Sequence, residues 1–169
     1  MMFVDIPAAA NIRQRRGEKE VRAFLDESAS VLGVVRRKHS GTLVRNVGST
    51  LICAFSKADV AVNAACEMQQ AMLDGFPGQP AKAILRIGLH AGGVIMEEGR
   101  CTGEVVATAA RMVTLAQPKQ VVLTEAVAEK LEGPCRKKLR PLPEGTALET
   151  RLKTKIYQVA WEKNGDDSA

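Results

Sequence analysis

Aromatic residues are scarce in this sequence, with four Phe, one Tyr and one Trp among 169 residues. The hydrophobic core must therefore rest on aliphatic side chains and Met. The net charge of +5 is mild, and the basic residues lie in short runs mixed with acids. No aromatic side chains interleave with these runs, as they do where single-stranded nucleic acid stacks. We therefore expect no nucleic-acid partner.

Several chemical signatures are also missing. The four cysteines (Cys53, Cys66, Cys101 and Cys135) form no Cys-x-x-Cys pair, which argues against zinc. Cys53 and Cys66 fall on apolar faces and are interpreted as small core residues. Free thiols fit a reducing cytoplasm, so we expect a cytoplasmic location. No apolar run approaches the roughly 18 residues needed to span a bilayer, so no membrane insertion of this segment is expected. A P-loop, a dinucleotide fingerprint and a Gly-x-Ser-x-Gly elbow are absent.

Hydrophobic periodicity predicts an alternation of helices and strands. We expect a turn into helix at residues 7–10 and helices over residues 18–39, 58–76, 103–115 and 125–131. Strands are expected over residues 1–6, 42–47, 50–55, 83–95, 120–123 and 155–161. This order predicts an α+β or α/β domain with one mixed central sheet flanked by helices. We place the domain at residues 1–162 and expect a disordered tail over residues 163–169.

Three local features refine this prediction. Gly88, Gly92 and Gly93 lie within the strand expected over residues 83–95, where glycine indicates a bulge or a close backbone approach. Thr124 precedes a helix and is expected to cap it. His90 lies between apolar neighbours and is interpreted as a structural histidine rather than a catalytic base. The Met residues of the helix at 58–76 are expected to fill the core.

Five segments, in order along the chain, resemble the class III adenylate and guanylate cyclases. They are Phe-Val-Asp-Ile at residues 3–6, Arg-Asn-Val-Gly-Ser at 45–49, Leu-Arg-Ile-Gly-Leu-His-Ala-Gly at 85–92, the helix Gly-Glu-Val-Val-Ala-Thr-Ala-Ala-Arg at 103–111, and Gln-Val-Val-Leu-Thr at 120–124. The resemblance covers residues 1 to about 161 and implies the ferredoxin-like fold of that family. It implies much less about activity, because function resides in the site.

The family closes a ribose 3′-hydroxyl onto the α-phosphate, with two metal ions held by two aspartates of one subunit. Its purine-reading and ribose-binding residues come from the other subunit of a head-to-tail dimer. By this resemblance Asp5 and the Ile6 carbonyl are metal ligands, and Arg111 stabilises charge on the transferring phosphate. The second aspartate is replaced by Ser49, a neutral hydroxyl that cannot clamp divalent cations.

Three further positions depart from the pattern of the family. Arg45 stands where a purine-reading lysine is expected, and Arg100 stands where its acidic companion is expected. Ala107 replaces the ribose-binding asparagine. A pyrophosphate-binding lysine could be Lys137, Lys153 or Lys155, and the sequence does not choose among them. Loss of a single transition-state donor costs about 10²–10³-fold in rate, so these changes together predict a pseudoenzyme.

We therefore expect a pseudo-cyclase that acts as a regulatory dimerisation module in signal transduction, as a homodimer or with another cyclase domain. No cofactor is expected, and Mg²⁺ or Mn²⁺ only if the domain is active. The alternative is a cyclase that is active, alone or with a complementing partner, on ATP or GTP. A different function on a similar scaffold, such as RNA binding, is a third hypothesis. Arg45, Arg100 and Arg111 could hold a nucleotide or another anion in the cleft, or could pair with Glu97, Glu98 and Glu104 and leave the cleft empty.

Overall fold

The structure, a computed structural model, describes residues 1–98 and 100–162; the tail expected over residues 163–169 lies outside them. The elements in chain order are β1 (Met2–Asp5), α1 (Ala8–Arg16), α2 (Glu18–Lys38), β2 (Thr42–Val47), β3 (Thr50–Ala54), α3 (Ala58–Gly75), β4 (Arg86–Leu89), β5 (Ile95–Glu97), β6 (Arg100–Thr102), α4 (Glu104–Leu115), β7 (Val121–Thr124), α5 (Glu125–Ala128), α6 (Gly133–Lys137), β8 (Leu139–Pro141), α7 (Ala147–Leu152) and β9 (Ile156–Val159). No helix in these two ranges has the length and hydropathy needed to cross a bilayer.

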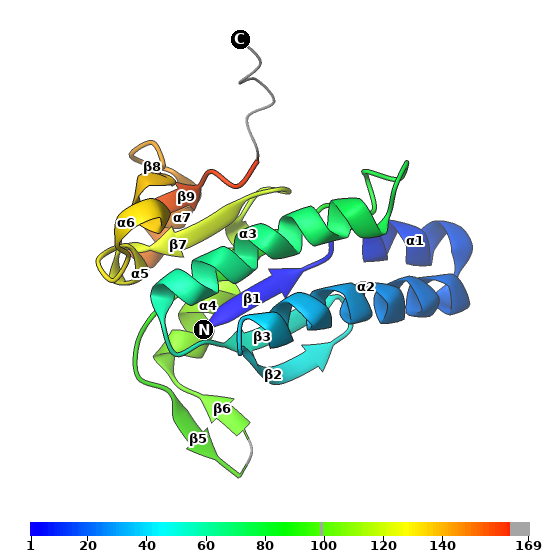
Figure 1. Cartoon of the computed structure of the whole chain (residues 1–169), viewed down its shortest axis with the longest axis horizontal. Coiled ribbons are helices and arrows are strands. Elements are labelled where there is room, and N and C mark those ends of the chain that lie inside the picture. The colour runs from blue at the N-terminus through cyan, green and yellow to red at the C-terminus, as the bar shows by residue number, and fades with distance from the viewer. Residues whose placement is uncertain (99, 163–169) are drawn as a thin grey trace.

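The main sheet has the strand order β2-β3-β1-β4-β7-β9-β8 (Figure 1). β1 is antiparallel to both β3 and β4, β4 is parallel to β7, and β7 is antiparallel to β9. The sheet is therefore mixed, which confirms the α+β prediction. β1 lies between strands that come from residues 50–54 and 86–89, so both of its edges are hydrogen-bonded to parts of the chain that are distant in sequence.

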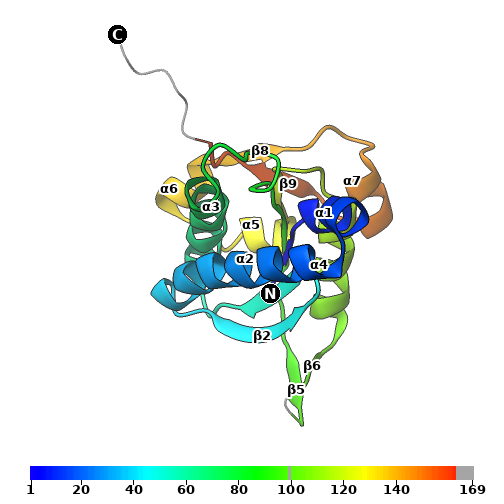
Figure 2. The same cartoon turned by 90° about the vertical axis from the view of Figure 1, so that its right-hand side faces the viewer.

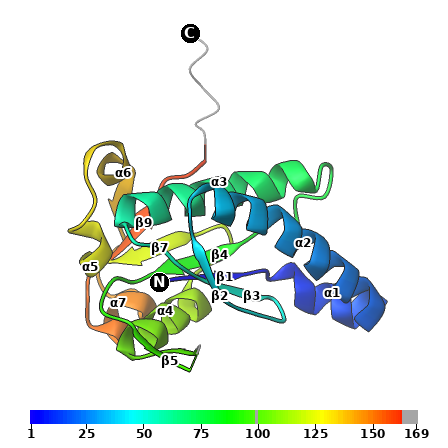
Figure 3. The same ribbon diagram turned by 60° about the horizontal axis from the view of Figure 1, so that its bottom comes forward.

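Helices cover both faces of this sheet: α2 and α3 lie on one side, and α4 and α7 on the other (Figure 3). Alternate residues of β1 point to the two layers. Met2 and Val4 belong to the cluster under α2 and α3, whereas Phe3 packs with Ala109 and Val113 of α4. This alternation follows from the two-residue period of a strand.

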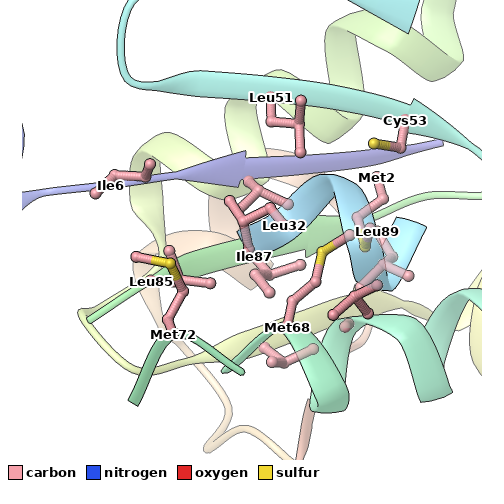
Figure 4. Packing of buried hydrophobic residues seen from close by; sticks show 14 of the residues in the cluster. Met2, Ile6, Leu32, Leu51, Cys53, Met68, Met72, Leu85, Ile87 and Leu89 are labelled. Atoms are coloured by element: carbon pink, nitrogen blue, oxygen red, sulfur yellow. The ribbon is translucent and has the colours of Figure 1, made fainter. Parts of the chain in front are cut away.

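The larger core is built mostly from aliphatic, Met and Cys side chains, with Phe24 and Phe76 as its buried aromatics, as the scarcity of aromatics predicts (Figure 4). Met68 and Met72 of α3 are fully buried against the sheet, which confirms their interpretation as core residues. Cys53 is also fully buried, and burial raises the pKa of its thiol to about 11. Cys66 is half-buried, and burial likewise raises its pKa. These thiols are chemically quiet at neutral pH.

The single strand predicted over residues 83–95 was wrong in extent. β4 ends at Leu89, and the apolar run beyond it forms β5, which pairs with β6 in a separate two-stranded sheet. This hairpin, called the arm (residues 95–102, of which 99 is not described), projects from the body of the domain (Figure 2). The strand ends because the chain turns away through Gly92 and Gly93. Gly88 allows the close approach of α4 to β4 that was predicted there, since a Cβ at this position would lie 3.0 Å from Met112 Cβ and Val113 N of α4.

Thr124 does not cap a helix through its side chain, contrary to the prediction. Its buried hydroxyl lies 2.7 Å from His90 Nδ1, and α5 is shorter than the helix expected over residues 125–131. The expected structural role of His90 fits this contact. Burial lowers the pKa of His90 and so favours the neutral ring.

The segment between α5 and β9 contains α6, β8 and α7, where the sequence analysis expected only a loop. α7 begins with a side-chain cap at Thr146. The Thr146 hydroxyl accepts a hydrogen bond from Glu149 N, and the Glu149 carboxylate accepts one from Gly145 N. This arrangement resembles the capping box Thr-x-x-Glu.

Candidate functional site

The Asp5 carboxylate lies at the end of β1, where the strand register places it opposite Arg86 of β4 and Thr50 of β3. Its residue is only 9% exposed. Oδ2 accepts a hydrogen bond from Arg86 Nε at 3.0 Å and a second from Arg86 Nη2. Oδ1 accepts one from Ser49 Oγ at 3.0 Å. Both carboxylate oxygens are therefore engaged by this chain's own side chains.

Ile6 and Ser49 join the same corner through their backbones. Ile6 N donates to Ser49 O at 3.0 Å, which ties the end of β1 to the β2–β3 turn. Gly48, with φ of 58°, allows this turn to adopt the left-handed conformation. The Ile6 carbonyl accepts a hydrogen bond from Ala9 N at 3.2 Å, at the start of α1. The structure thus brings together Asp5, Ile6 and Ser49, as the resemblance implied.

These residues do not fit a two-metal centre. A pair of divalent cations needs several anionic oxygens, and the corner offers one carboxylate, already neutralised by Arg86. A hydroxyl at Ser49 supplies no second charge. The Ile6 carbonyl is directed into the first turn of α1, so its lone pairs are shared with the backbone.

Arg86 is the residue of this corner that sequence reasoning did not single out. Its guanidinium forms an ion pair with Asp5, and their side chains are 28% and 12% exposed. Nη1 also donates weakly to Thr114 O of α4 at 3.5 Å. The available signal was an arginine and an aspartate at the ends of two strands expected to share one sheet. Only the antiparallel register of β1 and β4 makes them partners.

Arg111 and Ala107 lie one turn apart on the exposed face of α4. Arg111 lines a hollow of about 430 Å³ between α4 and α7, together with Thr114, Leu115 and Arg151. Ala107 presents only a methyl group on this face. The helix face can therefore offer cationic donors to a ligand or a partner, but no amide at position 107.

Arg45 and Arg100 lie on other elements than this corner. Arg45 is exposed on the edge strand β2, and Arg100 is exposed on β6 of the arm. Within residues 1–98 and 100–162, no ion pair joins Arg45, Arg100 or Arg111 to Asp5 or to Glu97, Glu98 and Glu104. One copy of the chain therefore does not assemble the residues that the resemblance assigned to a single cleft.

Apolar side chains are exposed on β2, which carries Arg45, and on the arm, which carries Arg100. Leu43 and Val47 of β2 are 46% and 54% exposed, and Ile95 and Met96 of β5 are 55% and 64% exposed. Large apolar side chains exposed together on one element are typical of a surface that contacts another molecule. β2 is also an edge strand, with backbone groups that no neighbouring strand satisfies.

Known proteins agree with this architecture. A protein of Rhizobium meliloti (strain 1021) named "Putative adenylate cyclase 3" is 30% identical over 97 residues, which is 56% of this chain and 16% of that protein. The matched region thus spans about a sixth of that relative's length.

Two solved structures share the fold. The catalytic core of a rhodopsin-guanylyl cyclase with converted specificity, in complex with ATPαS, matches with a TM-score of 0.77 and 22% identity over 94% of this chain and 93% of that one. A non-canonical dimeric guanylyl cyclase domain of the RhoGC fusion protein from the aquatic fungus Blastocladiella emersonii matches with a TM-score of 0.73 and 20% identity, over 94% and 91%. At these identities the likeness is one of fold.

The sequence profile of the adenylate and guanylate cyclase catalytic domain matches residues 1–160, nearly the whole described chain. The predicted family resemblance is confirmed, and the chain belongs to the class III adenylate and guanylate cyclase catalytic domain family.

Proposed function

We propose that this domain is a catalytically silent class III cyclase domain, a pseudoenzyme that acts as a cytoplasmic dimerisation module in signal transduction. The observation that carries the proposal is the closed corner at Asp5. Asp5 is the only carboxylate among the expected metal ligands, and Ser49 supplies a hydroxyl that donates to it, so the corner lacks the second carboxylate that the family's two-metal chemistry needs.

The other replaced positions support the same proposal. Ala107 supplies no hydrogen bond to a ribose, and Arg45 and Arg100 are both cations where the family pattern needs a cation and an acid to read a purine. Loss of a single transition-state donor alone costs about 10²–10³-fold in rate. A homodimer would carry the same defects in both of its clefts.

Dimerisation is proposed from the exposed apolar surface of β2 and the arm. Leu43 and Val47 lie on β2, the edge strand of the main sheet, and Ile95 and Met96 lie on the arm, which projects from the body of the domain (Figures 1 and 2). The B. emersonii domain with the same fold is described as dimeric. Either a second copy or a complete cyclase domain could cover this surface.

The test of silence is a mass-spectrometric assay for cAMP and cGMP with Mn²⁺ at high protein concentration. We expect no product above the level of a no-protein control. Clear turnover that disappears in Asp5→Ala would establish instead an active cyclase, which is the second candidate because Asp5 and Arg111 are retained.

A substitution at Ser49 tests the metal corner directly. Ser49→Asp places a second carboxylate about 3 Å from that of Asp5, so we expect a lower melting temperature without metal, because like charges repel. Millimolar Mn²⁺ should restore part of that loss in Ser49→Asp but leave the wild-type melting temperature unchanged. Ser49→Asn is the control, because the Asn side chain has nearly the shape of Asp but carries no charge. If Mn²⁺ raised the melting temperature of the wild type as much as that of Ser49→Asp, the wild-type corner would bind metal, which would contradict the proposal.

A further inference from the structure

A second recess lies at the opposite end of the sheet from Asp5. It has a volume of about 420 Å³ and lies where β3 and β4 end and α3 and α5 approach them. In Figure 1 this is the end of β1 marked N, beside the start of α3 and the root of the arm. The strand register shows that the recess and the Asp5 corner lie at opposite ends of β1 and β4, because Met2 is opposite Leu89 at the recess and Asp5 is opposite Arg86 at the corner.

The charged side chains that line this recess are both basic. Its lining includes Lys57 and Lys130 but no Asp or Glu. Neither lysine belongs to the ion pairs within 4.0 Å found among residues 1–98 and 100–162. Asp59 is the nearest acid in sequence to Lys57, and its carboxylate instead accepts a hydrogen bond from Glu132 N at 3.2 Å. Two ammonium groups that no carboxylate of the described residues approaches within 4.0 Å favour an anion at the recess.

The first N–H groups of α3 and the ring of His90 are further donors at this recess, secondary to the two lysines. Lys57 is the N-cap residue of α3, an 18-residue helix, and no side chain caps that end. The first N–H groups of a helix have no partners within the helix and carry a partial positive charge. His90 also lines the recess, with its ring held by Thr124.

The remaining wall is apolar. Phe55, Leu89 and Val127 line the recess beside Gly92 and Gly93. A ligand that satisfies both parts needs an anionic head of about two charges and a compact apolar body. Lysine ammonium groups bind phosphate as point charges, and ligand recesses commonly combine an apolar wall with a few polar groups.

We infer that this recess is a binding site for a small organic phosphate, with Lys57 and Lys130 holding the phosphate dianion and the Phe55 wall holding the organic body. The site is separate from the Asp5 corner and lies on the opposite end of β1 and β4. It does not depend on whether the domain is catalytically silent.

The experiment is a titration of ¹⁵N-labelled full chain with phenyl phosphate, followed by backbone amide shifts. We expect saturable shifts at Ala58, Asp59, Gly92 and Gly93. Lys57→Gln and Lys130→Gln should each weaken binding by about tenfold, because a hydrogen bond to a charged group is worth about 1.5–3 kcal/mol. Lys19→Gln, which removes an exposed lysine of α2, is the matched control and should bind like the wild type.

Inorganic phosphate is the second probe and should bind more weakly than phenyl phosphate, because it makes no contact with the apolar wall. Equal affinities would overturn the organic part of the assignment. Shifts spread over the whole surface, or identical titrations of Lys57→Gln, Lys130→Gln and Lys19→Gln, would overturn the site itself. Since the two lysines are exposed, their removal should leave the fold intact.

Discussion

The two ends of the β1–β4 pair differ in how their charges are balanced. At one end Asp5 and Arg86 neutralise each other while largely buried. At the other, Lys57 and Lys130 line a recess that contains no acidic side chain. The first end corresponds to the family's catalytic corner, and the second has no assigned role in the family pattern that the sequence resembles.

This contrast indicates where a ligand can gain from binding. A metal ion at Asp5 must displace a guanidinium that already donates twice to Oδ2, so much of the attraction between the ion and the carboxylate is cancelled. An anion at Lys57 and Lys130 displaces only water. Charged side chains therefore predict binding only when their internal partners are known.

The largest expected effect comes from removing Arg86. Arg86→Met leaves the nearly buried Asp5 carboxylate without its cation, and we expect a loss of about 3 kcal/mol in the free energy of unfolding, or roughly 10 °C in melting temperature. Urea denaturation and thermal melting measure it. Arg13→Met breaks the exposed Arg13–Glu18 pair, whose side chains are 51% and 65% exposed, and should cost less than about 1 kcal/mol.

The double variant Asp5→Leu/Arg86→Met sharpens this result, because it removes both charges and should recover most of the loss. If Arg86→Met and Arg13→Met destabilise the protein equally, the corner is not closed by this ion pair.

A smaller loss is expected at Gly88, which lies on β4 between the two ends. In Gly88→Ala the new Cβ would lie 3.0 Å from Met112 Cβ and from the Val113 backbone, which forces α4 away from the sheet at a cost of about 1–3 kcal/mol. Chemical denaturation measures this cost. Gly93→Ala is the control, because nothing lies within 4 Å of its Cβ position. Equal stability of the two variants would contradict the tight contact between α4 and β4.

The smallest effect concerns pH at the recess end. Burial lowers the pKa of His90 in the folded state, so the unfolded chain takes up the proton first as the pH falls. The contribution of neutral His90 to the free energy of unfolding is thus fully present above the ordinary histidine pKa of about 6.5, and it declines as the pH falls below that value. In His90→Gln the free energy of unfolding should therefore fall less with decreasing pH than in the wild type, as measured by urea denaturation over a pH series. Parallel curves for both proteins would exclude a contribution from His90.

Much of the fold could be predicted because its central elements have clear periodicity. The strands β2 and β3 and the helices α2 and α3 were found within a residue or two of their bounds. The arm was missed because Val94, Ile95 and Met96 are as apolar as a buried strand, and apolarity alone cannot show that a segment is exposed. Helix α7 was missed although Thr146 and Glu149 carry a recognisable cap.

The site was predictable only where residues are close in sequence or match a motif. Asp5, Ile6 and Ser49 were placed at one corner through the resemblance, and the structure brings them together. The ion pair with Arg86 and the recess at Lys57 and Lys130 were not foreseen. Both join residues more than 70 positions apart, and such pairings are set by strand register and helix packing rather than by local pattern. The assigned roles of Arg45, Arg100 and Arg111 stay predictions.

The position of β1 between β3 and β4 has a consequence for synthesis. The ribosome delivers β1 first among these strands, but its partner β4 follows some 80 residues later. Until then Met2, Phe3 and Val4 form an apolar strand with an unpaired edge, which is a segment prone to aggregation or chaperone capture. Slowing translation before residue 86 should therefore lower the soluble yield more than slowing it after residue 124, when the sheet can already form around β1.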